Sequence, residues 1–118
     1  MTTIYKICER GLLHAAEAEG AFRGSADDAR DGFIHFSTAG QLAETANKHF
    51  AGQTDLILVA VDAGRLGPQL KWEPSRGGAL FPHLYAPLSL DAVRWVRPLA
   101  DEINGNRPLP ELEPESQP

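Results

Sequence analysis

Polar side chains recur at every second position in two otherwise apolar segments, residues 33–37 and 81–85. Successive side chains of a strand point to opposite faces, so each segment would present its polar groups on one side. Glu73, on a third short segment expected to be a strand, would add a carboxylate if these faces converge. The converging polar groups would be His35, Ser37, Glu73, His83 and Tyr85. A few polar groups between apolar walls are typical of a small-molecule pocket, and we expect one here.

Proton transfer is the chemistry that these residue types offer. We predict His35, His83 and Glu73 as the catalytic residues, because imidazole exchanges protons near neutral pH and a carboxylate stabilises a developing cation. Arg76, beside Gly77 and Gly78, would close on an anion and is a predicted ligand-binding residue.

Each of these side chains also has a purely structural interpretation. His35 would be a core histidine bonded to the backbone, and His83 an exposed strand residue between prolines. Ser37 or Thr38 would cap a helix, with Gln41 completing a capping box after Thr38. Glu73 would form an ion pair with Arg76 or Arg94.

Two other kinds of site fit the sequence poorly. His35, His83 and Glu73 would make a two-histidine, one-carboxylate metal set, but no pair has the spacing of a helical metal motif, and we predict no metal. A serine hydrolase is disfavoured because Ser37 lacks the G-x-S-x-G context of a nucleophile elbow.

Composition predicts one domain at residues 1–100 and a disordered acidic, proline-containing tail at 101–118. The tail holds five acidic residues and one arginine, so it carries -4 of the net charge of -5. A body near -1 without a cluster of basic residues argues against nucleic acid as a partner. One cysteine excludes an internal disulfide, and neither a signal peptide nor a membrane-spanning segment is evident, so we expect a cytoplasmic protein. The oligomeric state is left open.

Hydrophobic periodicity predicts an α+β fold rather than a doubly wound sheet, because strands and helices do not alternate regularly. Residues 56–61 are apolar throughout, which is typical of a strand covered on both faces. Two prolines should confine residues 81–87 to an edge or bulged strand. Further strands are expected at 4–8, 33–37, 70–73 and 92–99, and helices at 10–19 and from 38 to about 50.

Three sequence blocks resemble the bacterial domain-of-unknown-function family numbered 952. They are D-G-F-I-H-F-S-T-x-x-Q at 31–41, W-E at 72–73 and F-P-H-L-Y-x-P-L at 81–88. The resemblance covers residues 3–98. It implies a fold similar to the ADP-ribosyltransferase-like superfamily, with a small two-sheet or strongly bent mixed sheet, flanking helices and NAD held in a cleft.

The resemblance also implies roles for particular residues. His35, Ser37 and Thr38 would occupy the strand that binds ribose and nicotinamide, Glu73 would stand near the catalytic carboxylate, and His83 and Tyr85 would belong to the family's own signature. Lys6 stands where family members commonly have a histidine, on the strand that contacts the ribose or phosphates. A lysine can meet a phosphate as a point charge.

We therefore expect an enzyme of ADP-ribosyl-transfer type with NAD as substrate and no other cofactor. The alternatives are a non-catalytic module that binds a nucleotide or small anion, and a structural protein that docks a partner through the acidic tail.

Overall fold

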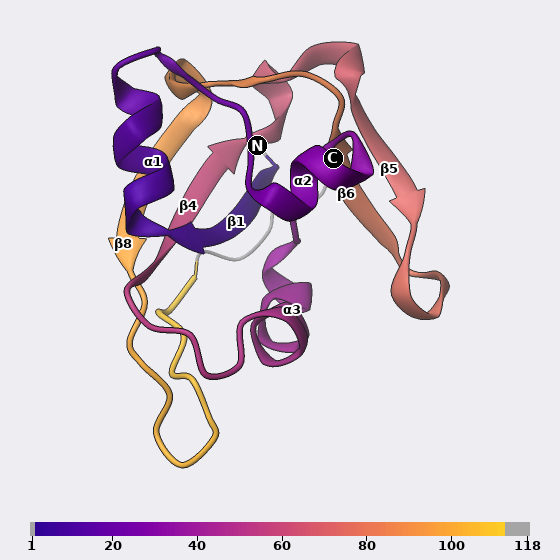
Figure 1. Ribbon diagram of the computed structural model, residues 1–118. Helices are drawn as coiled ribbons and strands as arrows, with labels where there is room; N and C mark the ends of the chain where they lie inside the picture. Colours follow the sequence, from indigo (N-terminus) through magenta and orange to yellow (C-terminus); the bar gives the residue numbers. More distant parts are fainter. Residues whose placement is uncertain (1, 113–118) are drawn as a thin grey trace.

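The strands of the chain form two antiparallel three-stranded sheets and one two-stranded sheet (Figure 1). The structure is a computed structural model and describes residues 2–112, apart from the side chain of Arg76. The first sheet has the order β1-β4-β8, the second has the order β3-β6-β5, and β2 pairs with β7. The strands are β1 (Thr3–Glu9), β2 (Ala21–Phe22), β3 (Ile34–His35), β4 (Leu56–Asp62), β5 (Leu70–Pro74), β6 (Leu80–Leu84), β7 (Leu88–Ser89) and β8 (Val93–Pro98).

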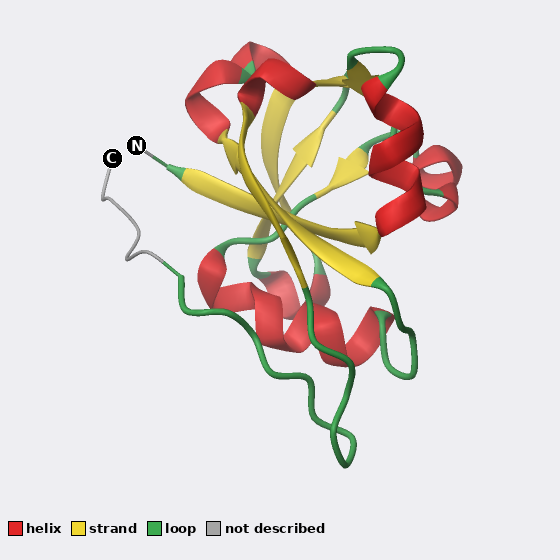
Figure 2. Cartoon of the chain, turned by 90° about the vertical axis from the view of Figure 1, so that its left-hand side faces the viewer, coloured by secondary structure: helices red, strands yellow, loops and turns green. Residues whose placement is uncertain are grey.

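Helices pack on both sides of the first sheet (Figure 2). The α-helices are α1 (Arg10–Glu17), α2 (Ala26–Asp31) and α3 (Leu42–His49). Short 3-10 turns lie at Ala39–Gln41, Ala63–Arg65, Gly67–Gln69, Arg76–Gly78 and Leu90–Ala92. The chain is thus an α+β protein with mostly antiparallel sheets. None of the helices within residues 2–112 is long and apolar enough to cross a membrane.

Strand β4 is central, as its unbroken apolar sequence predicts, and it pairs with β1 and β8. Ile57, Val59 and Val61 face the core that α1 covers. Leu56, Leu58 and Ala60 face the core that α3 covers. The apolar run therefore reflects burial on both faces, here in an antiparallel sheet.

Strand β1 brings a charged side chain into the interior. Ile4 and Cys8 belong to the core under α1, and Lys6 shares their face by strand alternation. Lys6 is only 6% exposed, so its ammonium needs a buried partner.

A β-bridge joins the two sheets at the point where the site forms. Tyr5 on β1 and Ser37, just after β3, exchange backbone hydrogen bonds of 2.8 Å in both directions. The strand predicted at 33–37 is thus shorter in the structure, because only Ile34 and His35 pair with β6. The bridge sets Lys6 close to the residues that leave β3.

The prediction of an edge or bulged strand at 81–87 is wrong, because β6 lies between β3 and β5 and pairs with both without a shift in register. Proline has no N–H to donate to a neighbouring strand. Pro82 is tolerated in β6 because the missing donor would point toward β3, whose pairing with β6 stops at His35. On that side its carbonyl accepts a hydrogen bond of 3.0 Å from the Phe36 N–H.

The prediction of a disordered tail from residue 101 is wrong for residues 101–112. The Arg107 guanidinium is buried and donates to the backbone carbonyls of Phe50, Gln53 and Ala100 at 2.8–3.1 Å. Leu109 and Leu112 pack against the core under α3, so apolar residues between the prolines anchor the segment. Residues 113–118 lie outside the described part of the chain.

Candidate functional site

A cavity of about 270 Å³ opens where β1, α2, β3, α3 and β6 meet. Lys6, His35, Ser37 and His83, all predicted site residues, line it. The remaining lining residues are Tyr5, Ile7, Ser25, Asp27, Asp28, Arg30, Asp31, Phe36, Thr45, His49, Phe50, Ser75 and Phe81. The mixture of apolar walls and a few charged groups is typical of a small-molecule site.

Strand alternation accounts for the wall formed by β3. Ile34 and Phe36 point into the core under α1, whereas His35 and Ser37 point into the cavity. His35 pairs directly with His83 of β6, so the sheet register sets the two imidazoles on one face. Their ring centroids lie 5.6 Å apart.

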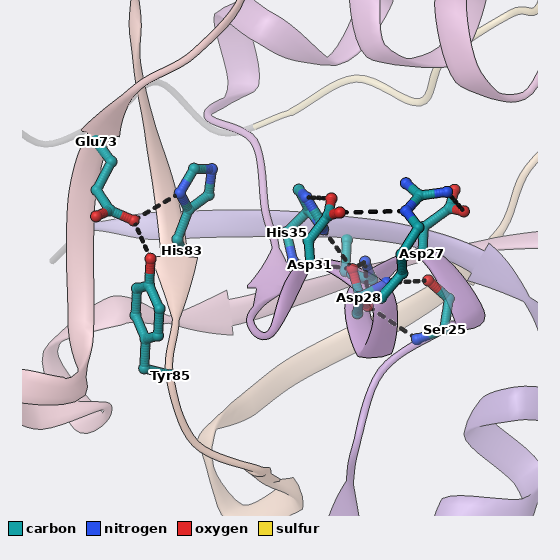
Figure 3. Close-up of polar contacts among 10 residues, drawn as sticks. Ser25, Asp27, Asp28, Asp31, His35, Glu73, His83 and Tyr85 are labelled. Carbon is teal, nitrogen blue, oxygen red and sulfur yellow. Dashed lines mark hydrogen bonds and ion pairs between the residues drawn. The ribbon is translucent and has the colours of Figure 1, made fainter.

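Asp28 is the buried anion of the cavity, and it connects three elements (Figure 3). Its carboxylate lies 2.8 Å from the Lys6 ammonium of β1. It accepts from the backbone N–H of Ser25 at 2.8 Å and from that of His35 at 3.1 Å. Burial alone would raise the pKa of Asp28, but the hydrogen bond to His35 and the charge of Lys6 outweigh it, and the pKa lies well below its ordinary value.

His35 is held between two carboxylates of α2. Its Nδ1 lies 2.6 Å from Oδ1 of Asp28, and its Nε2 lies 3.0 Å from Oδ2 of Asp31. A core histidine bonded to the backbone, the structural alternative for this residue, therefore does not describe it. A hydrogen bond from Arg30 is the main cause that lowers the pKa of Asp31.

His83 is held by one carboxylate and is itself buried. Its Nδ1 lies 2.9 Å from Oε1 of Glu73, and the same oxygen accepts a 2.7 Å hydrogen bond from the Tyr85 hydroxyl. The hydrogen bond from Tyr85 is the largest cause that lowers the pKa of Glu73, and the hydrogen bond with His83 is the next largest. The bond between Tyr85 and Glu73 also raises the pKa of Tyr85. Among the described residues, no group bonds to Nε2 of His83.

The Phe33 ring fixes the packing of the two histidines. It stacks on His83 with a centroid distance of 4.1 Å and an angle of 16°, and it contacts His35 at 4.5 Å and Tyr85 at 5.2 Å. An aromatic contact of this kind restricts both imidazoles to one orientation.

Ser37 and Thr38 have different environments. The Ser37 hydroxyl is buried in the lining and lies 2.9 Å from that of Thr45. Thr38 lies outside the lining and forms the expected capping box with Gln41. For Thr38 the structural interpretation is therefore confirmed.

Two predicted residues, Glu73 and Tyr85, lie outside the lining. The Glu73 carboxylate and the Tyr85 hydroxyl stand behind His83, and Tyr85 is exposed. Glu73 does not form the expected ion pair with Arg94, whose guanidinium donates to the Thr3 hydroxyl. The side chain of Arg76 lies outside the described part of the structure.

Sequence reasoning missed Asp28 and Asp31, because helix α2 was not predicted. The signal was Ser25 followed three residues later by Asp28, which form a reciprocal capping box at the start of α2. Gly32 then ends the helix in the left-handed conformation with φ 86°. His49 of α3 also lies in the lining. Within residues 2–112, no cluster of three or more histidine, cysteine or acidic side chains is arranged to hold a metal ion.

A family model and solved structures of a bacterial protein match the chain. The model of DUF952, a protein of unknown function, matches residues 7–96. The crystal structure of protein CC0527 from Caulobacter crescentus is 51% identical over 91% of this chain and 94% of that chain, with a TM-score of 0.87. The solution NMR structure of CC0527 is 53% identical over 92% of each chain, with a TM-score of 0.78. No curated protein sequence matches the chain.

Proposed function

The chain belongs to the DUF952 family of proteins of unknown function, and from the cavity we propose an acid–base enzyme that cleaves the glycosidic bond of a nucleotide such as NAD. The observation that carries the proposal is the hydrogen bonding of the two ring nitrogens of His83. Glu73 occupies its Nδ1, and among the described residues its Nε2 has no partner at the cavity. A carboxylate at one ring nitrogen fixes the tautomer that leaves the other nitrogen as a base.

His83 would act on the attacking group. Its Nε2 takes the proton of a water or acceptor hydroxyl, whose oxygen forms the new bond to the anomeric carbon of the ribose. The bond to the nicotinamide ring breaks, and its electron pair neutralises the positive charge of that ring. Glu73 would then be a positioning residue, because it acts through His83 and stands outside the lining.

The charges of the lining suit a cationic ring better than a bare phosphate. Three carboxylates, of Asp27, Asp28 and Asp31, stand against the two permanent cations of Lys6 and Arg30. The ammonium of Lys6 is already bound to Asp28, so it is a poor phosphate ligand. Carboxylates near the reacting carbon would stabilise the positive charge that develops on the ribose.

The size of the cavity indicates which part of the nucleotide it would hold. At about 270 Å³ it is slightly smaller than the pockets that enclose drug-sized ligands. We infer that the nicotinamide end enters and that the remainder of the dinucleotide lies outside. The likeness to the ADP-ribosyltransferase-like superfamily, which the three sequence blocks suggest, supports this assignment.

The test is the release of nicotinamide from NAD, measured by chromatography. We expect turnover by the wild type and a loss of about 10²-fold or more in His83→Gln, because that range is usual for a proton-transferring residue. His14→Gln is the matched control, since the His14 side chain is 85% exposed on α1 and should leave turnover unchanged. Absence of both turnover and NAD binding in the wild type would reject NAD as the substrate.

A non-catalytic binding module is the second candidate, and the position of Glu73 favours it. Its Oε1 accepts from His83 and Tyr85 and the residue lies outside the lining, so the carboxylate shapes the cavity through His83 and does not face the place of a reacting carbon. Glu73→Gln separates the two candidates. A catalyst loses turnover and keeps its affinity for NAD, whereas a binder changes in affinity alone.

A further inference from the structure

We propose that Asp28 is a second positioning residue of the cavity, and that it holds His35 as a hydrogen-bond donor opposite the base His83. This inference rests on the proposed acid–base function. It assigns hydrogen-bond donation to His35 and proton acceptance to His83, and it gives a role to Asp28, which lies outside the three sequence blocks.

The first step is the burial of Asp28 and the number of its partners. Asp28 is 2% exposed, and its two oxygens accept from Lys6, His35 and the Ser25 N–H. A buried carboxylate is tolerated only when such partners compensate it. The chain is also shaped around it, because a Cβ on Gly24 would lie 2.7 Å from Cβ and Oδ2 of Asp28.

The second step is the hydrogen count on the His35 ring. An ionised carboxylate only accepts hydrogen bonds, so contacts to Asp28 and Asp31 form together only when both ring nitrogens carry hydrogen. His83 has one carboxylate partner and needs one ring hydrogen. The environment of His35 therefore favours a hydrogen-bond donor, and that of His83 favours a base.

The third step is the balance of charge around His35. Lys6 faces it from β1, Asp28 and Asp31 from α2, and His83 from β6. A doubly protonated His35 and Lys6 together match the two carboxylates, so the group is neutral as a whole. Asp27 and Arg30 also line the cavity. Arg30 pairs with both Asp27 and Asp31 at 3.2 Å, and adding this one anion and one cation leaves the whole group neutral.

The two carboxylates would behave differently when a substrate enters. The Asp31 side chain is 36% exposed, so a substrate oxygen can replace it at Nε2 of His35. The buried Asp28 at Nδ1 stays in place and keeps the ring oriented. His35 would thus donate a hydrogen bond to the substrate while His83 accepts the proton.

The test is NMR spectroscopy of the full chain with ¹⁵N-labelled histidine, which reports the hydrogens on each ring nitrogen. At neutral pH we expect hydrogen on both nitrogens of His35 and on Nδ1 alone of His83. In Asp31→Asn and Asp28→Asn, a smaller fraction of His35 rings should carry hydrogen on both nitrogens than in the wild type under the same conditions. Asp27→Asn, on the same helix without a histidine contact, is the control and should leave His35 unchanged.

Two results would overturn the proposal. One is a His35 ring with a single hydrogen at neutral pH in the wild type, and the other is an Asp31→Asn spectrum identical to that of the wild type. Asp31 is partly exposed, so its variant remains informative if Asp28→Asn does not fold. The spectra need no substrate, so a failure of the NAD assay and a failure of this inference are separate results.

Discussion

The rings of His35 and His83 cross at 70° with their centroids 5.6 Å apart, as direct partners on neighbouring antiparallel strands. Each ring is bonded to carboxylates of a different element, α2 for His35 and β5 for His83. The sheet sets their separation, and the carboxylates set their hydrogen bonding. The site is therefore sensitive to changes at residues that do not line it.

Phe33→Leu should loosen both imidazoles while keeping an apolar side chain. The variant removes the stacking on His83 and the contacts to His35 and Tyr85, and aromatic pairs of this kind contribute about 1 kcal/mol. We expect a loss of about that size in the free energy of unfolding, measured by urea titration, together with lower turnover. Tyr85→Phe keeps the ring and should retain most of the stability, so equal losses in both variants would contradict the stacking argument.

Asp28→Asn should change the response of stability to acid. The pKa of Asp28 is lowered in the folded protein, so its stabilising effect is complete above the unfolded pKa of about 4 and is lost as the pH falls through the folded value. We expect the variant to lose about 3 kcal/mol at neutral pH, because Lys6 is left as a buried charge without its anion.

The difference between wild type and Asp28→Asn should shrink as the pH falls below about 4. Urea titrations over a pH series measure it. Asp27→Asn is the control, since its ion pair with Arg30 is exposed and contributes little. A stability difference that stays constant down to acid unfolding would show that the effect of Asp28 is not electrostatic.

Cys8 should resist alkylation in the native protein. Burial raises the pKa of its thiol to about 11, and the thiolate is the reactive form. We expect labelling by iodoacetamide at mildly alkaline pH to be slow in buffer and fast in denaturing urea, followed by mass spectrometry. Equal rates in the two solvents would contradict the buried position.

Arg107→Ala should release the segment that follows β8. The substitution removes three hydrogen bonds from a buried guanidinium to backbone carbonyls. A hydrogen bond to a charged group typically contributes about 2 kcal/mol. We expect a loss of about 2 kcal/mol or more in the free energy of unfolding, measured by urea titration. Arg65→Ala is the control, because the Arg65 side chain is 66% exposed and its pair with Asp62 is long, at 3.7 Å, so the substitution should cost little.

Gly24→Ala should be strongly destabilising, whereas Gly11→Ala should not. Gly24 has φ 99° and faces Asp28, so a methyl group there is strained and displaces the carboxylate. Gly11 lies exposed in α1 with nothing within 4 Å of its Cβ position, so alanine there should stabilise the helix by about 0.5–1 kcal/mol. Thermal unfolding of the two variants in parallel measures both effects, and an intact Gly24→Ala variant would contradict the packing around Asp28.

The sequence predicts those parts of the site that depend on strand periodicity. Alternation in residues 33–37 correctly separates Ile34 and Phe36, which enter the core, from His35 and Ser37, which enter the cavity. The central strand at 56–61 follows from its unbroken apolar run. Both patterns are local, and burial enforces them.

The sequence does not predict the features that depend on tertiary pairing. Helix α2 has only six residues and little apolar periodicity, so neither the helix nor its buried carboxylate Asp28 is predicted from the sequence. The central position of β6 depends on the short β3 ending before Pro82. The apolar residues near Arg107 are too few to form a core by themselves, but Leu109 and Leu112 pack against the core under α3.

The Arg107 contacts also have a consequence for the order of events during synthesis. Arg107 is made 57 residues after Phe50, whose carbonyl it binds and whose side chain borders the cavity. At about 5–20 residues per second, the ribosome completes all the lining residues seconds before Arg107 emerges. A chain that ends before that arginine would therefore contain every lining residue but would lack the Arg107 contacts on the α3 side of the cavity.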